Sequence, residues 1–240
     1  MTNAEKILIT YNKLDLYLKK EYGGNSFKSQ RDLINSLYQR KRCSHKEAKF
    51  LESIVDFRNI LVHEKSDESY FAEPNNDIMN KYEKIVNYII NPPKAYDFAV
   101  KKDICTATIN DKVYVVLKMM LTNNFSYIPI IENDKVQGIF SEHSIFAYLE
   151  SSEDEIIIDL NDNITCFNDF IAFNSHPNER FEFYGRDTPF YIVRNSYHKG
   201  LINNKRLGAV LITQNGNKYE KLLGLLTPWD ILRVDEREYV

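Results

Sequence analysis

The chain has 240 residues, 43% of them hydrophobic and 27% charged, and its formal net charge is −3. This composition is ordinary for a soluble globular protein of one large or two ordinary domains. No apolar run approaches the roughly 20 residues that cross a bilayer, and the N-terminus lacks a signal-peptide layout. We therefore expect a cytoplasmic protein with no membrane partner.

The charges are unevenly distributed, and the cysteines are few. Lysine and arginine outnumber acidic residues 16 to 13 in residues 1–94, whereas acidic residues lead 21 to 15 in residues 95–240. The front half is therefore the better candidate for binding a polyanion. Cys43, Cys105 and Cys166 are odd in number and far apart, which favours reduced thiols and suggests no metal site.

Residues 1–93 show helical spacing of apolar side chains and predict an all-helical domain. Ile7, Tyr11 and Leu18 belong to the apolar face of a first helix. Ser44 and Glu47 are three residues apart and predict a capping box at the start of a third helix. A fourth helix follows Pro74, and the Asn91-Pro92-Pro93 run marks the domain boundary.

The predicted third helix carries an arginine on its apolar face. With Phe57 set at zero and 100° per residue, Arg58 lies near 100°, inside an apolar arc of about 0° to 160°. Asn59 and His63 lie just beyond one edge of that arc and are four residues apart. A guanidinium on an apolar face needs an acidic partner, a subunit interface or a pocket.

The run from Phe57 to His63 resembles the HEPN signature (higher eukaryotes and prokaryotes nucleotide-binding), in which an Arg, a polar residue and a His follow the pattern R-[polar]-x-x-x-H. The resemblance implies a homodimer of helical bundles. It also implies metal-independent RNA cleavage, in which Arg58 holds the scissile phosphate, His63 transfers a proton and Asn59 completes the motif. The alternative is that Arg58 and His63 are structural and stabilise a dimer.

Residues 94–150 predict the order β-α-β-β-α, and the second half of the chain repeats it after a partly helical connection. We expect extended segments over 104–109, 125–131 and 136–141 and helices over 113–121 and 142–149 in the first copy. In the second copy we expect strands over 181–184, 209–213 and 222–227, with a hairpin turn over 214–217. A helix opened by Pro189 should carry Phe190, Val193 and Leu201.

The chain ends in a short apolar run, Gly224 to Leu226, followed by Thr227, Pro228 and Asp230. Proline suits the first turn of a helix, which places the Thr227 hydroxyl at a strand end and the Asp230 carboxylate one turn into the helix. Two interpretations follow from these residues. The pair accepts hydrogen bonds from the hydroxyls of a ribose, with a phosphate at the helix start, or Thr227 only caps the helix.

This ending resembles that of a CBS domain (named after cystathionine beta-synthase), which closes with a Gly–apolar–Thr/Ser-x-x-Asp run and binds the ribose of adenine nucleotides. Such domains occur in tandem pairs. In the first copy, Tyr127-Ile128-Pro129-Ile130 and Gly138-Ile139-Phe140-Ser141 match the family's strands, but Ser144 stands at the Asp position. Serine cannot offer a ribose two charged acceptors.

The two resemblances together predict an α + α/β protein, with a HEPN-like helical bundle at 1–93 and a tandem CBS pair of the Bateman type. The first CBS unit spans 94–150, and 151–240 hold the connecting segment and the second unit. The expected ligand-binding residues are Thr227, Asp230, Arg186, Asp187, Thr188 and Ala209.

Three functional hypotheses remain open from the sequence. In the first, the CBS pair binds an adenine nucleotide such as AMP, ADP or ATP, needs no other cofactor, and modulates a dimerising bundle. In the second, the bundle is a ribonuclease that the nucleotide gates, with RNA as its partner. In the third, the chain is a structural dimerisation module without a ligand.

Overall fold

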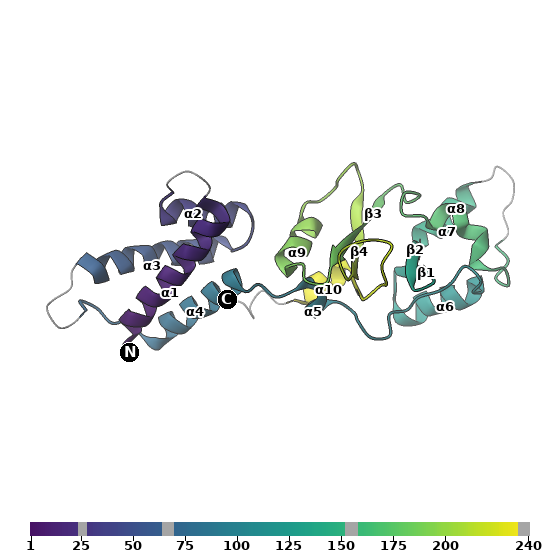
Figure 1. Cartoon of the computed structure of the whole chain (residues 1–240). Helices are drawn as coiled ribbons and strands as arrows, with labels where there is room; N and C mark the ends of the chain where they lie inside the picture. The colour runs from purple at the N-terminus through teal and green to yellow at the C-terminus, as the bar shows by residue number, and fades with distance from the viewer. Residues whose placement is uncertain (24–27, 64–69, 152–157, 235–240) are drawn as a thin grey trace. The chain divides into compact units, whose positions relative to one another are not determined.

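Residues 1–23, 28–63, 70–151 and 158–234 are described in a computed structural model of the chain (Figure 1). They form two compact units, Met1–Pro93 and Lys94–Val234. The first unit has one hydrophobic core, and the second contains three adjoining clusters of buried residues.

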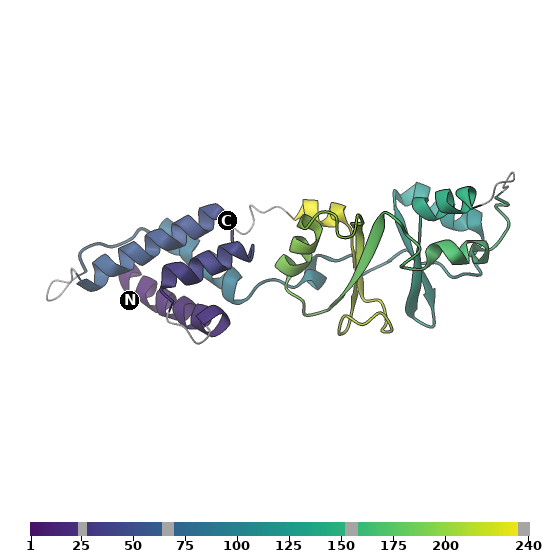
Figure 2. The same ribbon diagram turned by 90° about the horizontal axis from the view of Figure 1, so that it is seen from above.

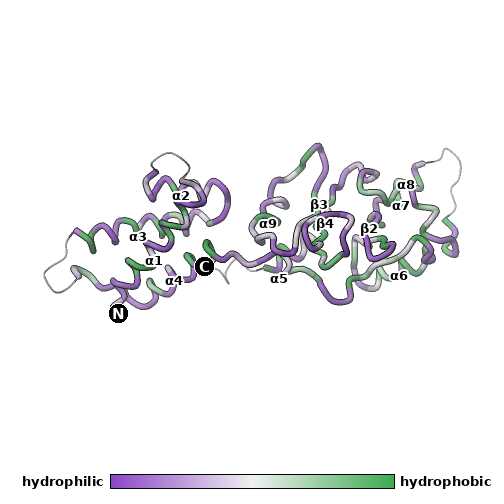
Figure 3. Tube along the Cα trace, viewed as in Figure 1, coloured by the Kyte–Doolittle hydropathy of each residue, from purple (hydrophilic) through white to green (hydrophobic). Residues whose placement is uncertain are grey.

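The first unit is helical, as its apolar spacing predicts. Helix α1 (Asn3–Leu18) continues into a π-helical turn, Lys19–Gly23, and is followed by α2 (Gln30–Gln39), α3 (His45–His63) and α4 (Asn76–Ile90). Helix α1 packs mainly on α4, and α2 packs on α3. Figure 3 shows hydrophobic and hydrophilic stretches alternating along these helices, as expected for helices that bury one face.

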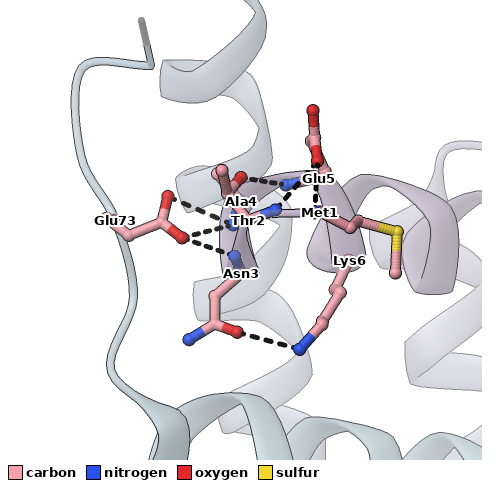
Figure 4. Close-up of polar contacts among 7 residues, drawn as sticks. All are labelled: Met1, Thr2, Asn3, Ala4, Glu5, Lys6 and Glu73. Carbon is pink, nitrogen blue, oxygen red and sulfur yellow. Dashed lines mark hydrogen bonds and ion pairs between the residues drawn. The ribbon is translucent and has the colours of Figure 1, made fainter.

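Side-chain caps begin several of these helices. The predicted capping box at the start of α3 is confirmed: the Ser44 N–H donates to Glu47 at 2.6 Å, and the Glu47 N–H donates to the Ser44 hydroxyl at 3.2 Å. At the start of α1, the carboxylate of Glu73 accepts the N–H groups of Asn3 and Ala4 (Figure 4). Glu73 thereby ties the segment before α4 to the exposed donors of the first helical turn.

The second unit contains the repeated pattern. The first copy comprises α5 (Ala95–Phe98), α6 (Val113–Asn123), β1 (Tyr127–Glu132), β2 (Lys135–Ser141) and α7 (Glu142–Glu150). A 3-10 helix, Ile164–Phe167, and α8 (Asn168–Ile171) lie in the connection. The second copy comprises β3 (Glu179–Gly185), α9 (Phe190–His198), β4 (Arg206–Thr213), β5 (Gly224–Leu226) and α10 (Pro228–Arg233).

The strands form two small sheets that face each other. Strands β1 and β2 are an antiparallel pair, whereas β4 pairs with β3 in parallel and with β5 antiparallel. Val136 and Ile139 of β2 share a buried cluster with Ala209 and Leu211 of β4. Figure 2 shows the sheets in the middle of this unit, with α9 and α10 outside one sheet and α6, α7 and α8 outside the other.

Two local predictions in the second copy are wrong. Leu201 does not belong to α9, which ends at His198, and its side chain is exposed. The cause is Gly200, whose φ of +69° is a left-handed conformation that terminates the helix. The predicted four-residue turn is instead a longer connection between Thr213 and Gly224. In the first copy, the extended segment over 104–109 contributes only an isolated bridge between Ala107 and Ile130.

A short helix at the start of the first copy, α5, packs on the second copy, and α8, which precedes the second copy, packs on the first. Helix α5 docks on the second copy, where the Ala95 N–H donates to the Thr188 carbonyl at 2.8 Å and Phe98 stacks against Phe190. Helix α8 docks on the first copy, so closely that a Cβ on Gly138 would lie 2.2 Å from the Ile171 carbonyl oxygen. This exchange joins the two copies into one unit.

Candidate functional site

Thr227 and Asp230 form a closed pair at the start of α10. The Thr227 hydroxyl donates to the Asp230 Oδ2 at 2.7 Å, and the Thr227 N–H donates to the same oxygen at 2.8 Å. Pro228 occupies the first helical turn, where its missing N–H leaves no bond unmade. The structure therefore shows the capping arrangement, and the ribose interpretation remains a prediction about a bound state.

The second carboxylate oxygen of Asp230 is differently placed. Oδ1 lies 3.9 Å from a guanidinium nitrogen of Arg233, and 13% of the Asp230 side chain is exposed. Tyr197 of α9 lies close by, and its hydroxyl donates to the Leu226 carbonyl at 2.8 Å. Burial raises the pKa of Tyr197, and the charge of Asp230 raises it further. Asp230 thus stands beside a neutral hydroxyl in a partly buried setting.

The equivalent position in the first copy is sealed. Ser144 is completely buried; its hydroxyl donates to the Phe170 carbonyl at 3.0 Å and accepts the Ser141 N–H at 3.2 Å. Phe167 of the connection stacks edge-on against Phe140 of β2. The segment that contains α8 therefore covers the surface where the first copy would offer hydroxyls to a ligand.

Arg186, Asp187 and Thr188 lie at the other end of the sheet from Thr227. Gly185 pairs with Thr213 at one end of β4, while Leu226 pairs with Val210 toward the other. Three residues of strand separate these levels, which is roughly 10 Å. The structure therefore does not bring Arg186 to Thr188 together with Thr227 and Asp230.

Those three residues are engaged with the start of the second unit. The Arg186 guanidinium lies 4.8 Å from the ring centre of Tyr96, and the Lys94 ammonium pairs with Asp187. The hydrogen bond from Lys94 and the positive charge of Lys94 lower the pKa of Asp187. The Thr188 carbonyl accepts a backbone bond from α5. Ala209, the remaining candidate, is fully buried in the cluster between the two sheets.

A second polar group lies at the Thr227 end of the sheet. The Glu179 side chain is 4% exposed, and its Oε1 accepts Arg206 Nη2 at 2.7 Å, Arg206 Nε at 3.1 Å and the Tyr127 hydroxyl at 2.8 Å. Sequence reasoning missed this group. The signal was present, since Glu179 and Arg206 both lie just before a predicted strand, but only the parallel register of β3 and β4 makes them neighbours.

In the bundle, Arg58 finds a partner that the sequence did not suggest. Its guanidinium lies 5.2 Å from the ring centre of Tyr11 on α1, a cation–π contact. Asn59 and His63 are exposed on α3. The nearby acids pair elsewhere, because Asp56 pairs with Arg31 and Glu52 with Lys49. Glu64, the acidic residue that follows His63 in the sequence, lies outside the described residues.

The described residues contain neither a metal-binding group of side chains nor a membrane-spanning helix. Across residues 1–23, 28–63, 70–151 and 158–234, no three His, Cys, Asp or Glu side chains are grouped so that they could hold a metal ion. In the same part of the chain, no helix has both the length and the apolar character that crossing a membrane requires.

Comparison with known families identifies the first copy. Residues 95–151 match the family model described as CBS domain, as the strand motifs of this copy suggest. The matched copy is the one with Ser144 at the Asp position, whereas the Thr227–Asp230 pair lies outside the matched residues. The chain has no significant match among curated proteins.

Among solved structures, several low-identity chains resemble part of this one. A putative acetoin utilization protein (AcuB) from Vibrio cholerae is 15% identical over 61% of this chain and 93% of its own, with a TM-score of 0.43. The CBS domain pair of protein MJ0100, solved with 5′-methylthioadenosine and S-adenosyl-L-methionine, is 18% identical over 61% and 98%, with a TM-score of 0.41. Protein MJ1225 from Methanocaldococcus jannaschii, described as a putative archaeal homolog of γ-AMPK, is 15% identical over 59% and 47%, with a TM-score of 0.44.

Proposed function

We propose that Lys94–Val234 is a regulatory CBS pair that binds one adenine nucleotide at Thr227 and Asp230. The observation that carries this proposal is the difference between the two copies. The second copy keeps a hydroxyl and a carboxylate at a partly exposed helix start, whereas the first copy buries its serine against the chain itself. One chain would therefore hold one ligand.

The chemistry of the pair suits a ribose. The two hydroxyls of a ribose are hydrogen-bond donors, and the carboxylate of Asp230 offers two acceptor oxygens. In the structure Oδ2 of Asp230 accepts both bonds from Thr227, while among the described residues Oδ1 has only a distant ion pair with the largely exposed Arg233. A ribose would accordingly use Oδ1 first, and the Thr227 hydroxyl would exchange its bond to Asp230 for one to the sugar.

Replacing the carboxylate tests the site. Asp230→Ala should weaken the binding of AMP, ADP or ATP by tenfold or more, which is about 1.4 kcal/mol, measured by calorimetry on the full chain. Asp134→Asn is the matched control, because Asp134 is an exposed carboxylate in the β1–β2 turn and its removal should leave affinity unchanged. Unaltered affinity in the Asp230 variant would remove this site.

The bundle would respond to the ligand as a dimerising partner. By resemblance, residues 1–93 form a HEPN-like unit, and two copies of the chain would associate through it. A ligand shifts such an arrangement only by its differential affinity for two states, typically of order 1–3 kcal/mol. We accordingly expect modulation of a homodimer rather than an absolute switch.

A ribonuclease is the second candidate, and the placement of α3 supports it. His63 and Asn59 are exposed on one helix, and Arg58 rests on Tyr11 without a paired acid among the described residues. An arginine held by an aromatic ring keeps its charge available to a phosphate. In this proposal RNA is the substrate, and His63 moves the proton during attack by the 2′-hydroxyl.

His63→Ala should abolish RNA cleavage and leave the melting temperature of the bundle unchanged, because the His63 side chain is exposed. The assay follows labelled RNAs of several sequences without added metal. His45→Ala, a change at the start of the same helix, is the control. Cleavage that survives in the His63 variant, or is missing from the pure wild-type protein, would reject the enzyme and leave the regulatory proposal standing.

A further inference from the structure

The arginines beside the Thr227–Asp230 pair already form ion pairs with carboxylates. Tyr197 marks the centre of this region, since it touches the Leu226 carbonyl and lies within electrostatic range of Asp230, Tyr127 and Arg180. Three arginines lie here, Arg180, Arg206 and Arg233, and each has a carboxylate partner.

Arg206 is held by Glu179. Two guanidinium nitrogens, Nη2 and Nε, contact the same oxygen of Glu179 at 2.7 and 3.1 Å. The Glu179 side chain is nearly buried, whereas that of Arg206 is mostly exposed. A buried carboxylate holds its cation more firmly than a solvated one does, so Arg206 is not free to turn toward a phosphate.

The other two arginines are paired as well. Arg180 pairs with Glu182 and donates to the Ser196 carbonyl at 3.2 Å, and both members of this ion pair are largely buried. Arg233 lies 3.9 Å from Asp230 itself. A phosphate that recruited Arg233 would compete with the carboxylate assigned to the ribose.

The carboxylates in this region outnumber the arginines. Glu142, at the start of α7, lies within electrostatic range of Tyr127 and Arg206. It joins Asp230 and Glu179 against Arg206 and Arg233, whereas Arg180 and Glu182 lie on the opposite face of β3, toward Ser196 of α9. In addition, Glu179 Oε2 is buried and has no hydrogen-bond donor among the described residues. An acceptor of this kind attracts a neutral donor, such as an amino or hydroxyl group, and repels an anion.

Resting on the proposed function, we propose that this site favours adenosine and its monophosphate over the di- and triphosphate, and that Glu179 enforces the selection. A triphosphate would bring several negative charges to a region in which Arg206 and Arg233 already pair with carboxylates, and burying an unpaired charge costs free energy. Adenosine carries the same base and ribose without that cost.

Calorimetry with adenosine, AMP and ATP on the full chain tests the selection. The wild-type protein should bind adenosine at least tenfold more tightly than ATP. Glu179→Gln keeps the size of the side chain, removes its charge and frees Arg206. The ratio of adenosine affinity to ATP affinity should therefore fall at least threefold. Glu220→Gln is the control, since Glu220 is an exposed carboxylate bonded to Asn215 in the β4–β5 connection, and should leave the ratio unchanged.

The outcomes separate this inference from the proposed function. Tighter binding of ATP than of adenosine by the wild-type protein would overturn the selection and leave the nucleotide site intact. Binding of none of the three compounds would reject both proposals. If Glu179→Gln does not fold, the salt dependence of the wild-type protein decides: ATP binding that strengthens steeply at low salt would reveal free cations and overturn the inference.

Discussion

At the scale of single residues, Arg58 shows what a sequence can and cannot predict. Helical periodicity correctly indicates that its guanidinium lies beside apolar neighbours and needs a partner. Besides a 3.4 Å hydrogen bond to the neighbouring Asn59, the partner is the ring of Tyr11 on another helix, which neutralises no charge. Identifying it requires knowing how α1 and α3 pack, and the spacing of residues within one helix carries no such information.

His176 should make the stability of the second unit depend on pH. It is completely buried, and burial lowers its pKa below the ordinary value. The folded state therefore holds the ring neutral, while the unfolded chain takes up a proton below about pH 6.5. The contribution of His176 is present above that pH and is lost as the pH falls, with a slope of up to about 1.4 kcal/mol per pH unit.

The measurement is urea unfolding between pH 7.5 and 5, followed by the fluorescence of Trp229, the single tryptophan. His176→Leu should flatten the pH dependence whatever its effect at pH 7.5, because the titrating ring is gone. An equal slope in both proteins would show that another group controls stability in this range.

At the scale of elements, the features that depend on neighbouring residues were predictable from the sequence, whereas the contacts that depend on strand pairing were not. The capping box at Ser44, the helix that follows Pro228 and the positions of the main strands all follow from nearby residues. Within the candidate site, Thr227 and Asp230 could be found for the same reason. Glu179 and Arg206 could not, because their contact depends on the register of a parallel pair with α9 between its strands.

A side chain at position 138 should disrupt the packing of α8 on the first copy. A Cβ there would meet the backbone oxygen of Ile171 at 2.2 Å, and backbone cannot move aside as a flexible side chain can. Gly138→Ala should destabilise the second unit by about 3 kcal/mol or more. Thermal unfolding followed by calorimetry measures the change.

Gly200 supplies the comparison for that experiment. It has a positive φ, and no heavy atom lies within 4 Å of a Cβ added there, so Gly200→Ala suffers only conformational strain, of about 1 kcal/mol. Similar destabilisation by the two substitutions would mean that α8 does not pack against Gly138 in solution.

At the scale of the whole molecule, each unit has its own hydrophobic core. The cluster of the bundle contains residues of α1 to α4 and their connections, and the clusters of the second unit contain residues from Ala95 onward. Composition and periodicity predicted a helical front and a repeated β-α back. They could not predict that the first copy would be closed by the connecting segment, because that closure depends on the docking of Phe167 and α8.

Separate fragments should therefore fold. Residues 1–93 alone should give a helical circular dichroism spectrum with cooperative melting, and residues 94–234 alone should melt cooperatively and bind adenosine within about threefold of the full chain, by linkage of binding to the folded state. An aggregated or unfolded 94–234 fragment would show that the bundle is needed to complete it.

Because α5 packs on the second copy, the chain that leaves the bundle first contacts the second copy. After Pro93 the chain runs directly into α5, which is anchored to the second copy by the Ala95–Thr188 bond and by paired backbone bonds between Val100 and Leu225. Leu225 lies two residues before Thr227. A structural change at Thr227 would therefore reach the segment that connects to the bundle through β5. It would not have to pass through the first copy.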